Sequence, residues 1–200
     1  MTHGHPASLI VHPPDAWKNR TMSTLRRAGP AGFTLIEVVV VIAIVAILLA
    51  LAVPSFVATT QRFRTLGEIN NFAHDLQFAR TEAIKQGVSV TVCASSDGAT
   101  CLKANTWHKG WIVFTDATAA LNVDALLRVQ SGWTNTDTLV ADNAVFSFTF
   151  SRDGYTIGLP GTGTVTTTLH TTPLNSAATQ CLALIKTGRQ QVLPAGPGCA

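Results

Sequence analysis

The hydrophobic positions of this 200-residue chain follow two different patterns. The first is an almost unbroken apolar run from Phe33 to Val53, which is 21 residues long and contains one charged residue, Glu37. A helix needs about 20 apolar residues to cross the hydrocarbon core of a bilayer. The run therefore predicts a membrane-spanning helix over residues 33–54, with a local perturbation at Pro54.

The second pattern follows the apolar run, where apolar residues recur every three or four positions. This spacing places them on one face of an amphipathic helix, which we expect over residues 55–87. Gly87 is typical of a helix C-cap, whereas Gly67 should weaken the helix locally. The predicted core-facing residues are Phe63, Leu66, Ile69, Ala73, Leu76, Ala79 and Ala83; the charged residues lying mostly off this stripe are Arg62, Arg64, Glu68, Asp75, Arg80 and Glu82.

Beyond Gly87 the period changes to two, which is the spacing of strands. Val88, Val90 and Val92 alternate with Ser89, Thr91 and Cys93, and this alternation predicts a half-buried strand. Further strands are expected at residues 110–116, 125–130, 145–150, 155–157, 163–170, 181–185 and 190–193. The fold class is therefore α+β, with one β-rich domain over residues 88–200 and no internal repeat.

Charge predicts the orientation of the membrane helix, because cationic flanks stay on the cytoplasmic side. Four cations precede the apolar run: Lys18, Arg20, Arg26 and Arg27. Residues from about position 55 onward should then face the periplasm or its equivalent, and the inner membrane is the expected location. The formal charge of +3 falls mainly in the first 32 residues, so the rest of the chain is nearly neutral.

The four cysteines agree with an oxidising compartment, where disulfides persist. Four cysteines allow three connectivities; we favour the two local pairs, Cys93–Cys101 and Cys181–Cys199. The spacings between them do not match a zinc ribbon, and no histidine lies within a few residues of the second pair. We therefore expect neither a metal site nor a cofactor.

Glu37 is the one charge inside the apolar run, and a carboxylate there costs about 2.5–3.5 kcal/mol on insertion scales. Such a residue calls for a cation at the same depth, most simply on a neighbouring chain. Cleavage after Gly32 would supply one, because it would expose the amine of Phe33, four residues before Glu37. The acid is then an assembly residue and not a part of a plain anchor.

The sequence Gly32-Phe33-Thr34-Leu35-Ile36-Glu37 resembles the processing site of type IV pilins and of type II secretion pseudopilins. The resemblance implies that a prepilin peptidase cuts between Gly32 and Phe33 and methylates the new N-terminus. Residues 1–32 are then a leader peptide. A start at Met22 would give a leader of 11 residues, which is more usual for the family than 32.

Two other fates of the N-terminal segment are open. In an ordinary secretory signal peptide, Ala50-Leu51-Ala52 would supply the A-x-A cleavage site. The apolar run is long for such a signal, Glu37 is out of place in it, and Pro54 crowds the cut. An uncleaved anchor is the other alternative, and intact-mass analysis distinguishes all three.

Within the pilin-like proteins, the chain resembles the group of type II secretion pseudopilin H and FimT over residues 30–192. Four segments carry this resemblance: Phe78 to Ala83, Val90 to Cys93, Trp107 to Asp116, and Cys181 to Arg189. It implies a pilin-like fold, in which a long N-terminal helix packs on an antiparallel sheet domain. It also implies a minor structural subunit of a pseudopilus or type IV pilus, whose partners are other pilins, prepilin peptidase and an inner-membrane assembly platform.

An alternative role is DNA binding for natural transformation, which the resemblance to FimT implies. Residues 154–200 contain Lys186 and Arg189 but no acidic residue, and phosphate contacts need such cations. The DNA-binding members have a Gly-Arg-x-Arg sequence, whereas this chain has Gly188-Arg189-Gln190-Gln191. The second arginine is missing, so two cations form a weak electrostatic footprint.

An enzyme is the third class considered, and no sequence pattern favours it. No nucleophile elbow, P-loop, HExxH motif or carboxylate pair is present. His74 and Asp75 lie on the predicted helix without a motif around them, and His170 is expected to be exposed on a Thr-rich strand. We expect no catalytic residue in this chain.

Overall fold

The computed structural model describes residues 32–199. The predicted leader and the start at Met22 therefore lie outside the described residues, apart from Gly32. The chain divides into two compact units, Met1–Ile44 and Val45–Ala200.

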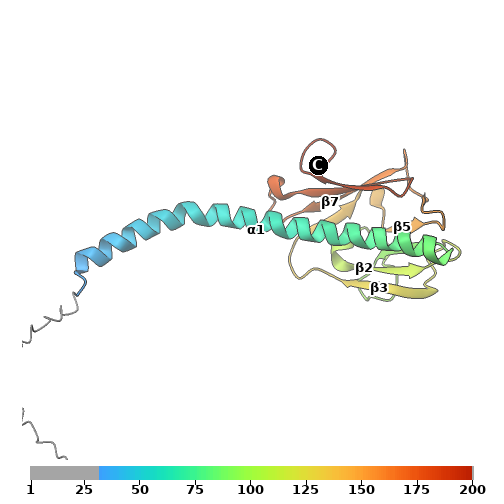
Figure 1. The fold of residues 1–200 in the computed structure, drawn as a ribbon, viewed down its shortest axis with the longest axis horizontal. Coiled ribbons are helices and arrows are strands. Elements are labelled where there is room, and N and C mark those ends of the chain that lie inside the picture. The colour runs from blue at the N-terminus through green and yellow to red at the C-terminus, as the bar shows by residue number, and fades with distance from the viewer. Residues whose placement is uncertain (1–31, 200) are drawn as a thin grey trace, which may run out of the picture. The chain divides into compact units, whose positions relative to one another are not determined.

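One helix, α1, covers Leu35–Gln86 (Figure 1). It begins in the apolar run, continues through Pro54 and ends before Gly87. Gly87 has a φ of +69°, and its N–H donates to the carbonyl of Ala83 at 3.0 Å. The predicted C-cap is confirmed, because glycine adopts this left-handed conformation without the steric cost of a Cβ atom.

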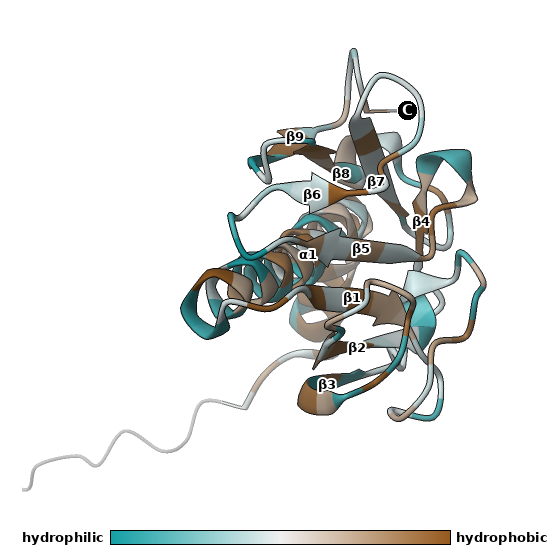
Figure 2. Cartoon of the chain, turned by 90° about the vertical axis from the view of Figure 1, so that its right-hand side faces the viewer, coloured by the Kyte–Doolittle hydropathy of each residue, from teal (hydrophilic) through white to brown (hydrophobic). Residues whose placement is uncertain are grey.

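Within residues 32–199, nine strands follow the helix and form two antiparallel sheets (Figure 2). The five-stranded sheet has the order β3-β2-β1-β5-β6, and the four-stranded sheet has the order β4-β7-β8-β9. The strand bounds are β1 Val90–Ala94, β2 Gly110–Thr115, β3 Ala125–Ser131, β4 Thr138–Ala141, β5 Ser147–Phe150, β6 Thr156–Ile157, β7 Thr164–His170, β8 Gln180–Ile185 and β9 Gln190–Pro194; short 3-10 turns cover Trp107–Lys109, Asp142–Ala144 and Ser176–Ala178. Strand β4 was not predicted from the sequence.

The main core lies between the distal part of α1 and both sheets. Phe72 is fully buried, and its ring centroid lies 5.1 Å from those of Trp107 and Trp111. The helix contributes Ile69, Phe72, Leu76, Ala79 and Ala83 to this core, and β1, β2, β5, β7 and β8 all contribute residues to it. Packing this apolar surface away from water is what holds the helix on the sheets.

One predicted core residue of the helix is wrong. Phe63 is 70% exposed, whereas Phe72 takes the buried position. Nine residues separate the two, which is two and a half helical turns, so they point to opposite sides of α1. The three-and-four spacing placed Phe63 on the predicted core-facing stripe. The buried face of the helix instead passes through Ile69, Phe72 and Leu76.

The prediction that the first strand is half-buried is also wrong, because all five residues of β1 are buried. Alternate residues of a strand point to opposite faces; Val92 joins the main core, and Cys93 joins a smaller cluster with Ile112 and Phe114. Cys101 packs against that smaller cluster. The loop that Cys93 and Cys101 close therefore covers the face of the sheet that was expected to meet water.

Ion pairs join α1 to the β domain at two positions along the helix, Arg64 and Asp75. Arg64 contacts the buried Asp137 through two hydrogen bonds of 2.9 Å. Asp75, expected off the core-facing stripe, is only 1% exposed. Its carboxylate pairs with Arg128 of β3, whose guanidinium carbon lies 4.1 Å from the centroid of the Phe78 ring. Buried carboxylates need such partners, because an unpaired charge in the interior is costly.

Candidate functional site

The start of α1 is built by two residues of the predicted processing motif. The backbone N–H of Glu37 donates to Thr34 Oγ1 at 3.3 Å, and the N–H of Val38 donates to the Thr34 carbonyl at 3.2 Å. Thr34 is thus the N-cap residue, and Glu37 stands three positions after it. A threonine followed by glutamate at this spacing is the sequence of a capping box. Sequence reasoning assigned no role to Thr34, although this spacing could have revealed it.

Gly32 and Phe33 lie ahead of the helix and are both exposed. A Cβ atom added to Gly32 would meet nothing within 4 Å, so packing within the described residues does not require a glycine there. The Phe33 side chain is 81% exposed. The backbone between them is therefore in the open, as a peptide bond must be to enter the active site of another protein.

Glu37 is exposed on α1 beside a shallow apolar hollow lined by Phe33, Val38, Val41 and Ile42. Among residues 32–199, no salt bridge includes Glu37. The carboxylate is therefore free within the part of the chain described to accept a cation from elsewhere. The structure brings Glu37 and Phe33 to the same short segment, as the sequence required.

By its length and composition, the apolar part of α1 could cross a membrane. None of the residues in its most hydrophobic stretch is buried. Every residue from Leu35 to Thr60 is exposed. So large a continuous apolar surface is not stable in water. It calls for lipid or another apolar surface around it.

The two cations singled out for DNA lie on the turn between β8 and β9. Lys186 and Arg189 are both exposed, and the turn is closed by Gly188 N–H donating to the Ile185 carbonyl at 2.8 Å. Within the described residues, neither cation is part of a salt bridge. Both side chains are available to solvent, and Lys186 also lines a hollow with Thr156 and the segment 158–163.

Arg80 of α1 ties this turn to the rest of the domain. Its Nε donates to the Gly154 carbonyl at 2.9 Å, and its Nη2 donates to the Thr187 carbonyl at 3.2 Å. A Cβ on Gly188 would lie 2.2 Å from the Gly154 oxygen. Gly188 therefore has a packing role at this close approach. Sequence reasoning placed Arg80 off the core and did not foresee the contact, because the carbonyls it reaches are more than 70 residues away.

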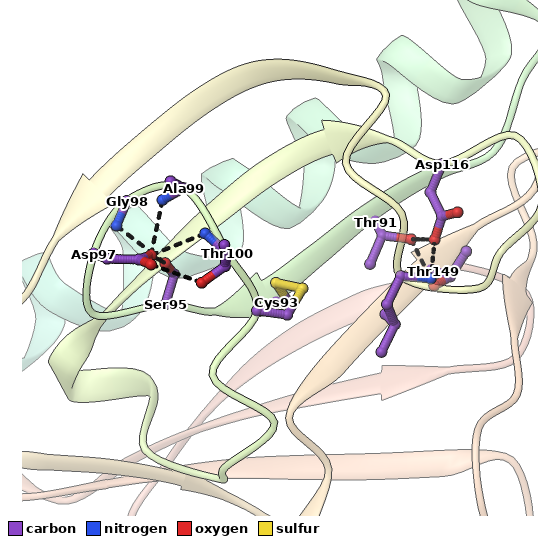
Figure 3. The surroundings of a disulfide bond; sticks show 11 residues. Thr91, Cys93, Ser95, Asp97, Gly98, Ala99, Thr100, Asp116 and Thr149 are labelled. Carbon is purple, nitrogen blue, oxygen red and sulfur yellow. Dashed lines mark hydrogen bonds between the residues drawn. A yellow bond between two sulfur atoms is a disulfide. The ribbon is translucent and has the colours of Figure 1, made fainter.

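Both disulfides are present, with the local pairing expected from the sequence: Cys93–Cys101 and Cys181–Cys199. Figure 3 shows the first, next to the loop organised by Asp97. The Asp97 carboxylate accepts from the N–H groups of Ala99 and Thr100 at 2.9 Å and from two hydroxyls, those of Thr100 and Ser95. These hydrogen bonds, led by the Thr100 hydroxyl, hold the pKa of Asp97 far below its usual range.

Two of the residues considered for catalysis lie side by side on α1. The Asp75 carboxylate accepts from Trp111 Nε1 at 2.8 Å and from Arg128, and the exposed His74 has its Nδ1 3.7 Å from Asp75 Oδ1. His170 is half-buried and not exposed as expected. Among residues 32–199 no group of three His, Cys, Asp or Glu side chains is placed to hold a metal ion.

Comparison with known protein families gives matches to two separate parts of the chain. A family model described as "Type II transport protein GspH" matches residues 68–188, and one described as "Prokaryotic N-terminal methylation motif" matches residues 27–53. The second match includes Gly32, Phe33 and Glu37. No curated protein matches the chain.

Two crystal structures of the type IV minor pilin FimU of Pseudomonas aeruginosa (strain PAO1) share the fold. The structure in space group P21 has a TM-score of 0.55 at 23% identity, covering 68% of this chain and 92% of that one. The structure in space group P65 has a TM-score of 0.50 at 24% identity, covering 66% and 92%. They confirm the pilin-like α+β fold. Since the GspH model matches more than half of the sequence, the chain belongs to the type II transport protein GspH family and carries the N-terminal methylation motif ahead of that domain.

Proposed function

We propose that the chain is a minor pseudopilin or pilin that becomes competent for assembly when its leader is removed. Prepilin peptidase would cut between Gly32 and Phe33, and the new amine of Phe33 would be methylated. The observation that carries the proposal is the motif segment itself. Gly32 is open, Phe33 is exposed, and Glu37 has no salt-bridge partner among residues 32–199.

The amine of Phe33 and the carboxylate of Glu37 would then pair between adjacent subunits. Such pairing fixes the axial register of neighbouring helices, because any offset leaves a charge unpaired in lipid. Thr34 supports it by capping the helix at Glu37, so that the backbone around the acid is ordered before a neighbour arrives. The domain over residues 88–200 would be carried by this anchor on the periplasmic side of the inner membrane.

The mass of the native polypeptide tests the processing step. A chain that begins at Phe33 and carries one additional methyl group supports the proposal. A chain with its leader intact contradicts it in favour of an uncleaved anchor, and one that begins beyond Ala52 contradicts it in favour of a secretory signal peptide. Gly32→Ala should leave the leader attached, which a gel shift detects.

Substitution of the acid tests the assembly step separately. Glu37→Gln keeps the shape of the side chain and removes its charge, so processing should continue while incorporation into the filament falls. Glu82→Gln is the matched control, because Glu82 is an acid of the same helix whose carboxylate accepts from Lys85 and Gln86. Normal incorporation of Glu37→Gln would rule out the pairing.

The machine is either a type II secretion pseudopilus or a type IV pilus, assembled with other pilins by an inner-membrane platform. DNA binding remains a prediction that rests on the exposure of Lys186 and Arg189. Duplex DNA retarded by the full chain in detergent at low salt, with the effect lost on Lys186→Ala and Arg189→Ala, would support it. No retardation at tens of micromolar protein would remove it.

A further inference from the structure

The five-stranded sheet has one long open edge, the outer side of strand β3. The strand at the other end of that sheet, β6, has two residues, and Thr156 N–H in it donates to the Lys186 carbonyl at 2.9 Å. That end is therefore short and joined to the β8–β9 turn. Strand β3 has seven residues, and Figure 2 shows it as the outermost strand below β2.

The register shows which backbone groups face this edge. Successive residues of an antiparallel strand direct their N–H and C=O groups alternately to the two sides. The Gly110 carbonyl accepts from Ser95 N–H at 2.9 Å, on the side of β1. The next residue of β2, Trp111, therefore faces β3, where its partner in the ladder is Gln130. It follows that Val129 and Ser131, on either side of Gln130, direct their N–H groups outward.

Three of these outward groups are open: the N–H and C=O of Val129 and the N–H of Ser131. The Ser131 carbonyl accepts from Gln130 Nε2 at 3.1 Å and is thus occupied. No other hydrogen bond within residues 32–199 reaches the three open groups. Extended backbone is the chemical group that matches such a row of alternating donors and acceptors.

Strand β3 itself has no proline or lysine, which are residues that normally protect an open strand. Lys109 and Asp97 line a hollow with Val129 and Ser131 beside it. The one charged residue of β3, Arg128, is turned toward α1, where it pairs with Asp75 and lies over Phe78. Four residues of the strand are exposed, Ala125, Leu126, Val129 and Ser131. The two large ones are apolar: Leu126 is 46% exposed and Val129 is 45% exposed.

Side chains on one face of strand β3 bind it to α1. Arg128 and Gln130 reach α1 through Asp75 and Asn71, and the Asn71 Nδ2 donates to Gln130 Oε1 at 3.1 Å. Because side chains alternate between faces, Val129 points to the other face, beside Gly98 of the Cys93–Cys101 loop. A partner strand would therefore meet a preformed edge and would not have to order it.

We propose that the open edge of β3 receives an extended backbone segment from another subunit of the same filament, which adds to the five-stranded sheet as a sixth strand. The proposal rests on the proposed function, since a pilin-type subunit is surrounded by other subunits. The partner segment would pair its backbone with Val129 and Ser131 and place an apolar side chain against Val129. It is a contact of the β domain, separate from the contact that Glu37 makes in the membrane.

Val129→Pro tests the edge, because it removes an outward N–H and leaves the ladder to β2 intact. Incorporation of the full-length chain into purified filaments should fall by about tenfold or more, since one acceptor of the partner is left buried without a donor. Val129→Thr keeps the N–H and a similar size, and it should incorporate like the unmodified chain. Thermal unfolding of both variants in detergent reports whether the domain is still folded.

A photoreactive amino acid, p-benzoylphenylalanine, in place of Ser131 gives a second test that does not alter the backbone. A cross-link to an extended segment of another pilin-type subunit supports the proposal. A cross-link to lipid, to a second copy of this chain or to no protein overturns it. Incorporation of Val129→Pro at the unmodified level also overturns it while leaving the proposed function intact, whereas failure of the unmodified chain to incorporate would overturn both.

Discussion

Trp111 donates its indole Nε1–H to Asp75 Oδ2 at 2.8 Å in the centre of the domain, where both residues are buried. The second oxygen of Asp75 pairs with Arg128. This one carboxylate therefore joins three elements, since Asp75 lies on α1, Trp111 on β2 and Arg128 on β3. It fixes the rotation of the helix on the five-stranded sheet, which apolar packing alone would specify less sharply.

Asp75→Ala should strongly destabilise the domain. The substitution leaves the Arg128 guanidinium without its counter-charge and the Trp111 N–H without an acceptor. The unsatisfied Trp111 N–H alone costs about 1–3 kcal/mol, and the lost pair with the partly exposed Arg128 adds to it. Thermal unfolding of the full chain in detergent measures the effect. Glu82→Ala removes only the pair with the exposed Lys85 and should change stability far less. A small effect of Asp75→Ala would show that Arg128 finds solvent in place of the carboxylate.

Thr34→Val should loosen the start of α1 without changing its apolar character. The substitution removes the oxygen that accepts the Glu37 N–H, and loss of an N-cap costs about 1 kcal/mol. Amide hydrogen exchange of Glu37 in detergent should become about fivefold faster. Thr34→Ser retains the hydroxyl and should exchange like the unmodified chain, so equal rates in the three proteins would exclude a capping role.

The sequence predicted the features of the fold that depend on local pattern. The apolar run, the C-cap at Gly87 and most strands follow from spacing over a few residues. Patterns of this kind cannot show what covers an element from far along the chain. The outer face of β1 was predicted to meet solvent from the alternation of its residues alone. The expected Cys93–Cys101 pair indicated a loop next to the strand, but not that this loop folds back over the outer face of β1.

The same limit applies to the polar residues. Asp75 and Arg80 look like solvated helix charges in the sequence, yet their partners Arg128, Gly154 and Thr187 are 53 to 107 residues away. At the N-terminal motif, in contrast, Thr34 and Glu37 are three residues apart. That site could be located from sequence because all of its chemistry lies within one turn of helix.

Glu68 gives the stability of the domain a dependence on pH. Burial raises the pKa of the Glu68 carboxyl above its ordinary value of 4.5, the Asn135 side chain opposes this by donating to Glu68, and the nearby Asp137 adds to the rise. The folded state therefore binds a proton more tightly than the unfolded state at this group. Its contribution to stability is present below pH 4.5 and is lost as pH rises through the raised pKa of the folded state.

Glu68→Gln should accordingly stabilise the domain at neutral pH. Glutamine can still accept from Asn135, which donates to Glu68 Oε1 at 2.6 Å, and it carries no charge to desolvate. The gain should shrink as pH falls toward 4.5. Unfolding curves of both proteins between pH 4 and pH 8 give the comparison, and a difference that does not vary with pH would exclude titration of Glu68 as its cause.

Gly188→Ala and Gly158→Ala form a matched pair that isolates one close approach. Both glycines have a left-handed backbone, with φ of +76° and +73°, so alanine costs about 1–2 kcal/mol at either position for conformation alone. At Gly158 a new Cβ meets nothing within 4 Å, whereas at Gly188 it would lie 2.2 Å from the Gly154 oxygen and 2.9 Å from Arg80 Nε. Such a clash forces the turn away from α1 and should add about 1–3 kcal/mol. The difference between the two unfolding free energies measures that contact. If the two variants are equally stable, the β8–β9 turn does not depend on Arg80 to hold Lys186 and Arg189 in place.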